Sequence, residues 1–205
     1  MKRRATIVDY GLGNLHSVAN ALRYIGMEVE LAETGEMLHM ATHVVLPGVG
    51  AFADAMAGLR NRGHDIALRR FVESGQGPLL GICLGAQLLL GESAEFGTTQ
   101  GLGIIPGKVA SVPANGQKIP HVGWKMIELT KEGLRQNIVP SGLWSYFVHS
   151  FHAVPSDPAH VLGRVKYGSD HITALVGYER VIGCQFHPEK SGQEGLAILK
   201  SFMQL

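Results

Sequence analysis

The sequence predicts one α/β domain over residues 1–205: an open, mostly parallel sheet with flanking helices, followed by additional mixed or antiparallel strands. Three observations lead to this fold class. Hydrophobic residues make up 45% of the chain and charged residues 17%, which is typical of a globular protein and excludes a disordered chain or a charged coiled coil. Short apolar runs alternate with helical periodicity up to about residue 95. After Gly97, short β-rich runs are separated by Gly, Pro and Asn.

The first part of the chain predicts four strands and four helices in alternation. Apolar, β-branched or alternating runs predict strands at residues 6–8, 28–31, 43–46 and 78–82. Apolar residues at helical spacing predict helices at residues 14–25, 53–59, 66–72 and 84–90. Because each pair of strands is joined through a helical or long connection, we expect these strands to be parallel.

The second part of the chain has a different pattern, in which short strands predominate. Strands are expected at residues 107–113, 118–129, 143–148, 161–167, 172–176 and 181–186. Only residues 193–203 return to helical periodicity. The sequence contains no internal repeat and no convincing linker, so we expect a single domain over residues 1–205.

Composition excludes several classes of partner. The 18 basic and 17 acidic residues give a formal charge of +1, and no basic tract is present, so no nucleic-acid partner is expected. No apolar stretch reaches membrane-spanning length, so no membrane partner is expected. Two cysteines are too few for a disulfide framework and indicate a reducing compartment, which predicts a cytoplasmic protein.

Two weaker patterns do not predict a cofactor or a metal. Residues 11–16, Gly-Leu-Gly-Asn-Leu-His, begin like a dinucleotide-binding fingerprint but have His16 where that fingerprint has glycine. Ten histidines are present, but the pairs His39/His43 and His149/His152 lack the glutamate and third ligand of a zinc-protease site. We therefore expect no cofactor and no metal.

A cysteine lies between glycines at residues 81–85, Gly-Ile-Cys-Leu-Gly, where a predicted strand runs into a helix. A nucleophile at such a turn has a strained backbone and an exposed side chain, and neighbours without Cβ atoms relieve the crowding. The start of the following helix stabilises a thiolate and an oxyanion. The alternative is a buried structural cysteine, Cys83, beside glycines that serve packing alone.

The second motif is Phe-His-Pro-Glu at residues 186–189. In an extended segment His187 and Glu189 project to the same side, so they can form an imidazole–carboxylate pair. Such a carboxylate fixes the tautomer of the imidazole and stabilises its cation. The alternative is an ordinary exposed His and Glu at a strand end.

The third motif is Leu-Pro-Gly-Val-Gly-Ala-Phe at residues 46–52, after a predicted strand. Glycines allow the backbone to approach a ligand, and the turn presents amide groups at the edge where α/β sheets bind ligands. The alternative is a generic Pro-Gly turn.

Together, residues 81–87 and 186–189 resemble the class I, or triad, glutamine amidotransferases. Within that class, five further motifs resemble the glutaminase subunits of imidazole glycerol phosphate synthase: Tyr10–Asn14, Pro47–Phe52, Pro120–Trp124, Tyr146–Ser150 and Lys190-Ser191. The resemblance runs from Ile7 to the last predicted helix and implies the fold of that class.

The resemblance implies a function for each of three side chains. Cys83 is expected to be the nucleophile, His187 the acid/base and Glu189 its orienting carboxylate. The backbone amides of three further residues are expected to form the oxyanion hole: Val49, Gly50 and Leu84.

Gln87 and Glu95 match family positions that hold the substrate, L-glutamine. Gln87 lies one helical turn from Cys83, and Glu95 supplies an anion for the α-ammonium group. Without the resemblance, a helix-surface amide and a solvated loop carboxylate are the simpler readings.

The family also implies a heterodimer with a cyclase subunit. The residues expected at this partner interface are Asn14, Trp124, Lys125 and Lys190. Lys125 departs from the usual family pattern, which has Asn after Gly-Trp. Taken alone, Asn14 would be a helix cap and Lys190 a solvated charge.

The implied function is hydrolysis of glutamine to glutamate and ammonia, with delivery of the ammonia to the cyclase in histidine biosynthesis. Three alternatives remain: a glutaminase serving another synthase, a catalytically silent scaffold that binds a partner, and a cysteine hydrolase acting on peptides. The intact set Cys83, His187 and Glu189 counts against the scaffold, whereas Gln87 and Glu95 suit a free amino acid better than a peptide.

Overall fold

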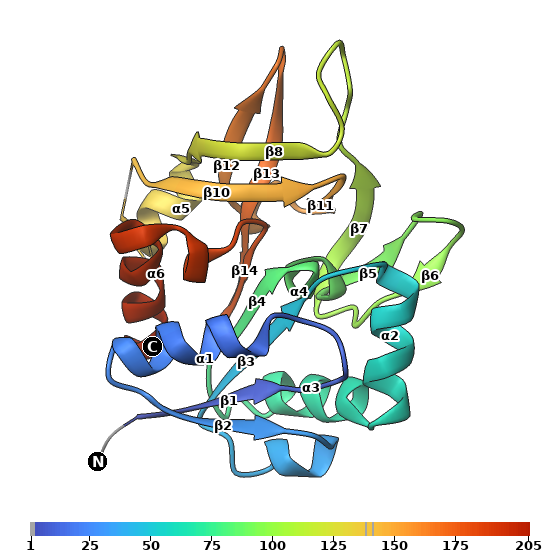
Figure 1. The fold of residues 1–205 in the computed structure, drawn as a ribbon. Helices are drawn as coiled ribbons and strands as arrows, with labels where there is room; N and C mark the ends of the chain where they lie inside the picture. The colour runs from blue at the N-terminus through green and yellow to red at the C-terminus, as the bar shows by residue number, and fades with distance from the viewer. Residues whose placement is uncertain (1–2, 138, 141) are drawn as a thin grey trace.

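The main sheet is formed by the apolar runs that the sequence predicts as strands (Figure 1). The computed structural model describes residues 3–137, 139–140 and 142–205. Within these residues, the order of the eight-stranded sheet is β2 (Glu28–Ala32), β1 (Arg4–Val8), β3 (His43–Gly48), β4 (Leu79–Cys83), β14 (Val181–Cys184), β13 (Asp170–Tyr178), β12 (Val161–Tyr167) and β9 (Glu128–Leu129). The first five strands are parallel and the last three antiparallel, as the sequence predicts.

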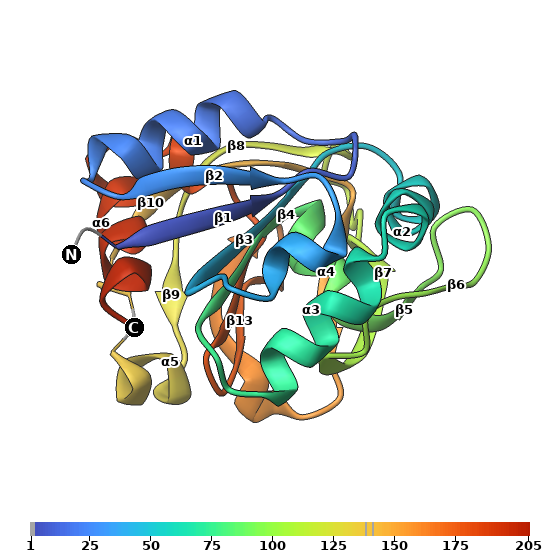
Figure 2. The same ribbon diagram turned by 90° about the horizontal axis from the view of Figure 1, so that it is seen from below.

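Helices cover both faces of this sheet (Figure 2). One face packs against α1 (Leu15–Tyr24) and α6 (Gly192–Gln204), and the other against α2 (Phe52–Asn61) and α3 (His64–Glu73). The apolar stripes of these helices are buried in two separate clusters, one on each side of the sheet. Burial of these stripes provides most of the stability of each helix, because helices of this length are marginal alone.

Two smaller sheets complete the fold. A two-stranded antiparallel sheet consists of β8 (His121–Met126) and β10 (Trp144–His149), which lie side by side in the upper half of Figure 1. A four-stranded sheet has the order β11 (Phe151–Pro155), β7 (Ile105–Ser111), β5 (Leu90–Ser93) and β6 (Thr99–Gln100). The remaining helical segments are α4 (Leu84–Leu88), α5 (Lys131–Gln136), η1 (Gly35–Leu38), η2 (Pro158–His160) and η3 (Pro188–Lys190). No helix in the described part of the chain is long and apolar enough to cross a bilayer.

Several predicted boundaries are wrong. The helix predicted at residues 84–90 ends at Leu88, because Leu90 begins β5 and pairs with Ile105. The strand predicted at residues 118–129 begins at His121 and is interrupted at the buried residue Ile127. The short elements β5, β6, β11 and α5 were not predicted, because so few residues carry little periodicity.

Candidate active site

Three neighbouring parallel strands end at one edge of the main sheet and bring the candidate residues together. Gly48 at the end of β3 is in register with Cys83 at the end of β4. On the other side of β4, Cys184 of β14 is in register with Ile82, so the segment after β14 passes beside Cys83. This is the edge where parallel α/β sheets bind ligands.

Cys83 has the strained backbone that the sequence predicts, with φ 54° and ψ −111°. A Cβ on Gly81 would lie 2.8 Å from the backbone of Ala86, and a Cβ on Gly85 would lie 1.8 Å from the carbonyl oxygen of Leu46. The two glycines are therefore required by the close packing of β4, α4 and β3 around the turn.

The side chain of Cys83 is less exposed than the elbow motif suggests. Only 7% of the residue is accessible, and its Sγ lies 4.0 Å from the carbonyl oxygen of Val148 in β10. The predicted exposure is wrong because β10 crosses over the end of β4. Cys184, in contrast, is completely buried, as expected for a small packing residue.

His187 and Glu189 form the predicted pair. The Nδ1 atom of His187 lies 2.8 Å from Oε1 of Glu189, and the two side chains are 4% and 1% exposed. Burial alone would lower the pKa of His187, but hydrogen bonding and charge from Cys83 and Glu189 outweigh it and raise that pKa to about 9. Protonated His187 is thus favoured beside Cys83 at neutral pH.

The backbone of this pair differs from the extended segment that the sequence predicts. His187 is extended, but residues Pro188–Lys190 form the 3₁₀ turn η3. Proline is well suited to the first position of such a turn, since its fixed φ is helical and it needs no amide hydrogen. The turn brings Glu189 back toward His187, so the predicted contact is made by a different local geometry.

A cavity of about 370 Å³ collects most of the predicted site residues. Its lining includes Val49, Gly50, Cys83, Leu84, Gln87, Glu95 and His187. Residues 148–151, which run from the end of β10 into the start of β11, complete the wall. Glu189 lies behind His187 and does not line this cavity.

The two predicted substrate residues are already bonded within the protein. Gln87 is 5% exposed, and its Nε2 donates to the carbonyl oxygen of Phe151 at 2.9 Å and to Oε1 of Gln185 at 3.0 Å. Glu95 accepts a 2.8 Å hydrogen bond from the backbone amide of Phe52, the first residue of α2. The alternatives, a helix-surface amide for Gln87 and a solvated loop carboxylate for Glu95, therefore do not describe these residues.

Two of the four predicted interface residues, Trp124 and Lys125, are neighbours on β8. Successive residues of a strand point to opposite faces, so Trp124 and Lys125 are separated by β8. Trp124 is 50% exposed, whereas Lys125 lies on the face of His121: burial and the charge of Lys125 lower the pKa of His121 to about 4. The two side chains thus leave β8 on opposite faces, and their contacts with a partner stay a prediction.

Asn14 and Lys190 both lie close to the candidate triad. Asn14 accepts a hydrogen bond from the amide of Ser17 and caps α1, and it also borders a small cavity with His187 and Glu189. Lys190 is exposed, and its backbone amide donates to the carbonyl oxygen of His187 at 3.0 Å. Asn14 is thus both the cap of α1 and a residue beside the candidate site.

Sequence reasoning missed Gln185. This residue is 3% exposed, and its Nε2 lies 4.0 Å from Sγ of Cys83. The signal was present: Gln185 and His187 are two residues apart at the exit of β14, so alternation directs both toward the same side. The rule that residues two apart share a side, which pairs His187 with Glu189, also places Gln185 on the side of His187.

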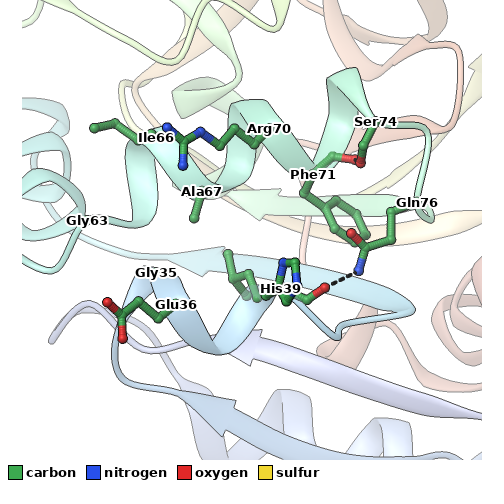
Figure 3. A pocket seen from close by; sticks show the side chains of 11 residues that line it. Gly35, Glu36, His39, Gly63, Ile66, Ala67, Arg70, Phe71, Ser74 and Gln76 are labelled. Atoms are coloured by element: carbon green, nitrogen blue, oxygen red, sulfur yellow. Dashed lines mark hydrogen bonds between the residues drawn. The ribbon is translucent and has the colours of Figure 1, made fainter.

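A larger cavity lies away from these residues (Figure 3). It measures about 700 Å³ and lies between η1 and α3, beside the start of β4. Its lining is mostly apolar, and Gln76 there donates to the carbonyl oxygen of His39. It contains none of the predicted site residues, so size alone does not identify the site.

Metal ligands do not converge in the described residues: no three side chains of His, Cys, Asp or Glu are placed to share an ion. His121 and His149 do contact each other, with Nδ1 of His121 2.9 Å from Nε2 of His149. Nδ1 of His149 lies 2.8 Å from the carbonyl oxygen of Phe151, so both rings belong to a hydrogen-bonded network.

Comparison with known proteins identifies the family. Residues 6–205 match the family model described as glutamine amidotransferase class-I. The chain belongs to this family. The match covers nearly all of the chain and confirms the resemblance drawn from the motifs around Cys83 and His187.

Curated relatives place the chain more finely within the glutamine amidotransferases. It is 46% identical to imidazole glycerol phosphate synthase subunit HisH 1 of Legionella pneumophila (strain Lens), over 98% of both chains. It is 44% identical to the HisH subunit of Moorella thermoacetica, over 99% of this chain and 95% of that one. The chain is thus a HisH-type glutamine amidotransferase, an enzyme subunit.

A solved structure supports the same fold. The structure of PurLQS from Thermotoga maritima aligns with a TM-score of 0.77 over 100% of this chain and 99% of that one, at 22% identity. At this identity the likeness concerns the glutamine amidotransferase fold alone.

Proposed function

We propose that this chain is the glutaminase subunit of an imidazole glycerol phosphate synthase. It hydrolyses glutamine to glutamate and ammonia and passes the ammonia to a cyclase subunit, which forms imidazole glycerol phosphate and aminoimidazole carboxamide ribotide in histidine biosynthesis. The observation that carries this proposal is the convergence of Cys83 and the His187–Glu189 pair on one cavity of about 370 Å³.

The proposed reaction proceeds through a thioester. The sulfur of Cys83 attacks the side-chain carbonyl carbon of glutamine, and protonated His187, whose pKa is raised to about 9, passes its proton to the departing ammonia. Neutral His187 then takes a proton from water, which attacks the thioester and releases glutamate. Glu189 holds the Nδ1 side of the ring, so that Nε2 is directed toward the reacting atoms.

Stabilisation of the oxyanion is assigned to backbone amides of Val49, Gly50 and Leu84, all of which line the cavity. Gly50 has a φ of +100°, a conformation that glycine adopts without strain. Gly48 is held tightly as well: a Cβ there would lie 2.6 Å from the hydroxyl of Tyr10, which donates to the carbonyl oxygen of Pro47.

The proposed cyclase interface is the outer face of the two-stranded sheet, which we call the β8–β10 face. Its side chains form three cross-strand pairs: Val122 with Val148, Trp124 with Tyr146, and Met126 with Trp144. Most of these apolar side chains are exposed, and contiguous exposed apolar surface of this kind marks a protein-binding site.

The β8–β10 face is directly connected to the candidate triad. The carbonyl oxygen of Tyr146 accepts a 3.1 Å hydrogen bond from the backbone amide of His187. Two residues further along β10, the carbonyl oxygen of Val148 lies 4.0 Å from Sγ of Cys83. A partner that shifts β10 would therefore move groups in contact with both residues.

This arrangement predicts control by the partner. We expect low glutaminase activity from the isolated chain and a large rise when the cyclase and its nucleotide ligand are added. Lys190→Ala should blunt this rise without changing the reactivity of Cys83 in the free subunit, because Lys190 is exposed and its backbone is bonded to His187. Ammonia release, measured with and without the cyclase, is the test.

Lys200→Ala serves as the matched control, since Lys200 is an exposed lysine in the second half of α6, ten residues beyond Lys190. It should leave the rise intact. Full activity from the isolated chain, unchanged by any cyclase, would instead favour an independent glutaminase.

Glu95 gives a prediction about the substrate. Glu95→Ala should raise the KM for glutamine by roughly 100-fold, because a charge-assisted hydrogen bond to the α-ammonium group is lost. Reaction of Cys83 with a small alkylating reagent should persist, since that reagent needs no α-ammonium site.

The wild-type protein should also prefer glutamine to asparagine, whose shorter side chain cannot span the distance from Glu95 to Cys83. Equal hydrolysis of the two amino acids would contradict this assignment.

A further inference from the structure

We propose that Gln185 is a positioning residue that donates a hydrogen bond to the sulfur of Cys83 and stabilises its thiolate. This inference rests on the proposed function, because it takes Cys83 as the nucleophile. It adds to the triad a side chain that approaches the sulfur from within the protein.

The fold brings Gln185 to the sulfur through strand register. Cys184 is paired with Ile82, so the next residue along β14 lies beside Cys83, the next residue along β4. The backbone amide of Gln185 is fixed by a 2.9 Å hydrogen bond to the carbonyl oxygen of Ala174 in β13. With 3% of its surface accessible, Gln185 has little freedom to turn its carboxamide toward solvent.

The direction of the hydrogen bonds is set by a backbone carbonyl. The oxygen of Phe151 can only accept, so the group of Gln87 that lies 2.9 Å from it must be the amide nitrogen. The second hydrogen of that nitrogen points to Gln185 at 3.0 Å, which makes the facing atom of Gln185 its oxygen. The nitrogen of Gln185 is then left on the side of Cys83, where it can donate to Sγ at 4.0 Å.

The same carbonyl oxygen of Phe151 also accepts from an imidazole. His149 is neutral, since burial and neighbouring positive groups lower its pKa to about 3. Its Nδ1 donates to the carbonyl oxygen of Phe151 at 2.8 Å, so its Nε2 accepts from Nδ1 of His121 at 2.9 Å. Two runs of donors therefore meet at the carbonyl oxygen of Phe151, which accepts from His149 and from Gln87, and the run that leaves Gln87 in the other direction ends at Cys83.

This polarity also restricts how Gln87 can meet glutamine. Both hydrogens of its Nε2 are used, on Phe151 and on Gln185. Only its Oε1 remains for the substrate, so Gln87 can accept a hydrogen bond from glutamine but not donate one.

The test is the pH dependence of alkylation of Cys83 by iodoacetamide, read by peptide mass, because the thiolate is the reacting form. Gln185→Met keeps the size of the side chain and removes both hydrogen bonds. Gln185→Glu keeps an acceptor for Gln87, removes the donor to the sulfur and adds a carboxylate beside it. We expect the midpoint of the alkylation curve to move to higher pH by about one unit in Gln185→Met, and further in Gln185→Glu because the carboxylate also repels the thiolate, with the same maximal rate at high pH.

Gln76→Met is the matched control. Gln76 also makes two side-chain hydrogen bonds, to the carbonyl oxygens of His39 and Ala41, but it lies near the opposite end of β4 (Figure 3). Its curve should coincide with that of the wild type. An equal displacement in Gln76→Met would mean that general destabilisation moves the midpoint, and would overturn the inference.

The two Gln185 variants distinguish the possible roles of Gln185 from one another. A wild-type midpoint in Gln185→Met would show that Gln185 only fills space. A wild-type midpoint in Gln185→Glu alone would show that it acts through Gln87 and not on the sulfur. Failure of the proposed function looks different: the wild-type protein would not be alkylated at Cys83, or alkylation of Cys83 would leave glutaminase activity intact.

Discussion

Cys83→Ala is expected to reduce glutamine hydrolysis by roughly 10⁴-fold or more, because no other group can form the thioester. The fold should survive. The substitution removes one sulfur atom that borders a cavity, while the backbone at φ 54° is held by the packing of Gly81 and Gly85. Ammonia release from the complex with the cyclase, measured beside a thermal unfolding curve, tests both statements.

Cys184→Ala is the matched control for this experiment. Cys184 is the last residue of β14, three residues before His187, but it is completely buried and does not line the cavity. We expect Cys184→Ala to lose some stability, since a packed sulfur is removed, and to retain activity. Substantial hydrolysis by Cys83→Ala would overturn the assignment of the nucleophile.

His187→Ala should reduce hydrolysis about as much as Cys83→Ala, because members of a triad act as one unit. Glu189→Gln should reduce it less, by roughly 10²–10⁴-fold, since Glu189 holds the orientation of the ring and does not transfer the proton. The measurement is kcat for glutamine in the complex with the cyclase. A larger loss in Glu189→Gln than in His187→Ala would require the two roles to be exchanged.

Glu189→Gln should also change how the free energy of unfolding depends on pH. The pKa of His187 is raised from its ordinary value of 6.5 to about 9, so the protonated ring stabilises the folded state. That contribution is complete below about pH 6.5 and is lost as the pH rises through about 9. The difference in free energy of unfolding between the wild type and Glu189→Gln should therefore be largest at pH 6 and shrink above pH 9.

Most of the fold follows from local pattern. Apart from His43, the runs at residues 43–46 and 78–82 are apolar, and in the structure β3 and β4 are adjacent and buried near the centre of the sheet. The helices α1, α2, α3 and α6 are long enough to show one apolar face, so their periodicity was readable. The elements that were missed are β5, β6, β11 and α5, whose two to six residues are defined by their neighbours instead.

The sequence by itself determined which residue types stand at the candidate site: a cysteine between two glycines, a histidine with a carboxylate two residues on, and a glycine turn after a strand. These features are local, since each depends on the conformation of a few successive residues. Only the tertiary structure decided how they meet. The register of β14 with β4 places Gln185 beside Cys83, 102 residues away in the chain, and β10 covers the thiol. The pleat of β8 separates Trp124 from Lys125. Distances across strands depend on pairing between distant segments, and one sequence read along its length does not specify that pairing.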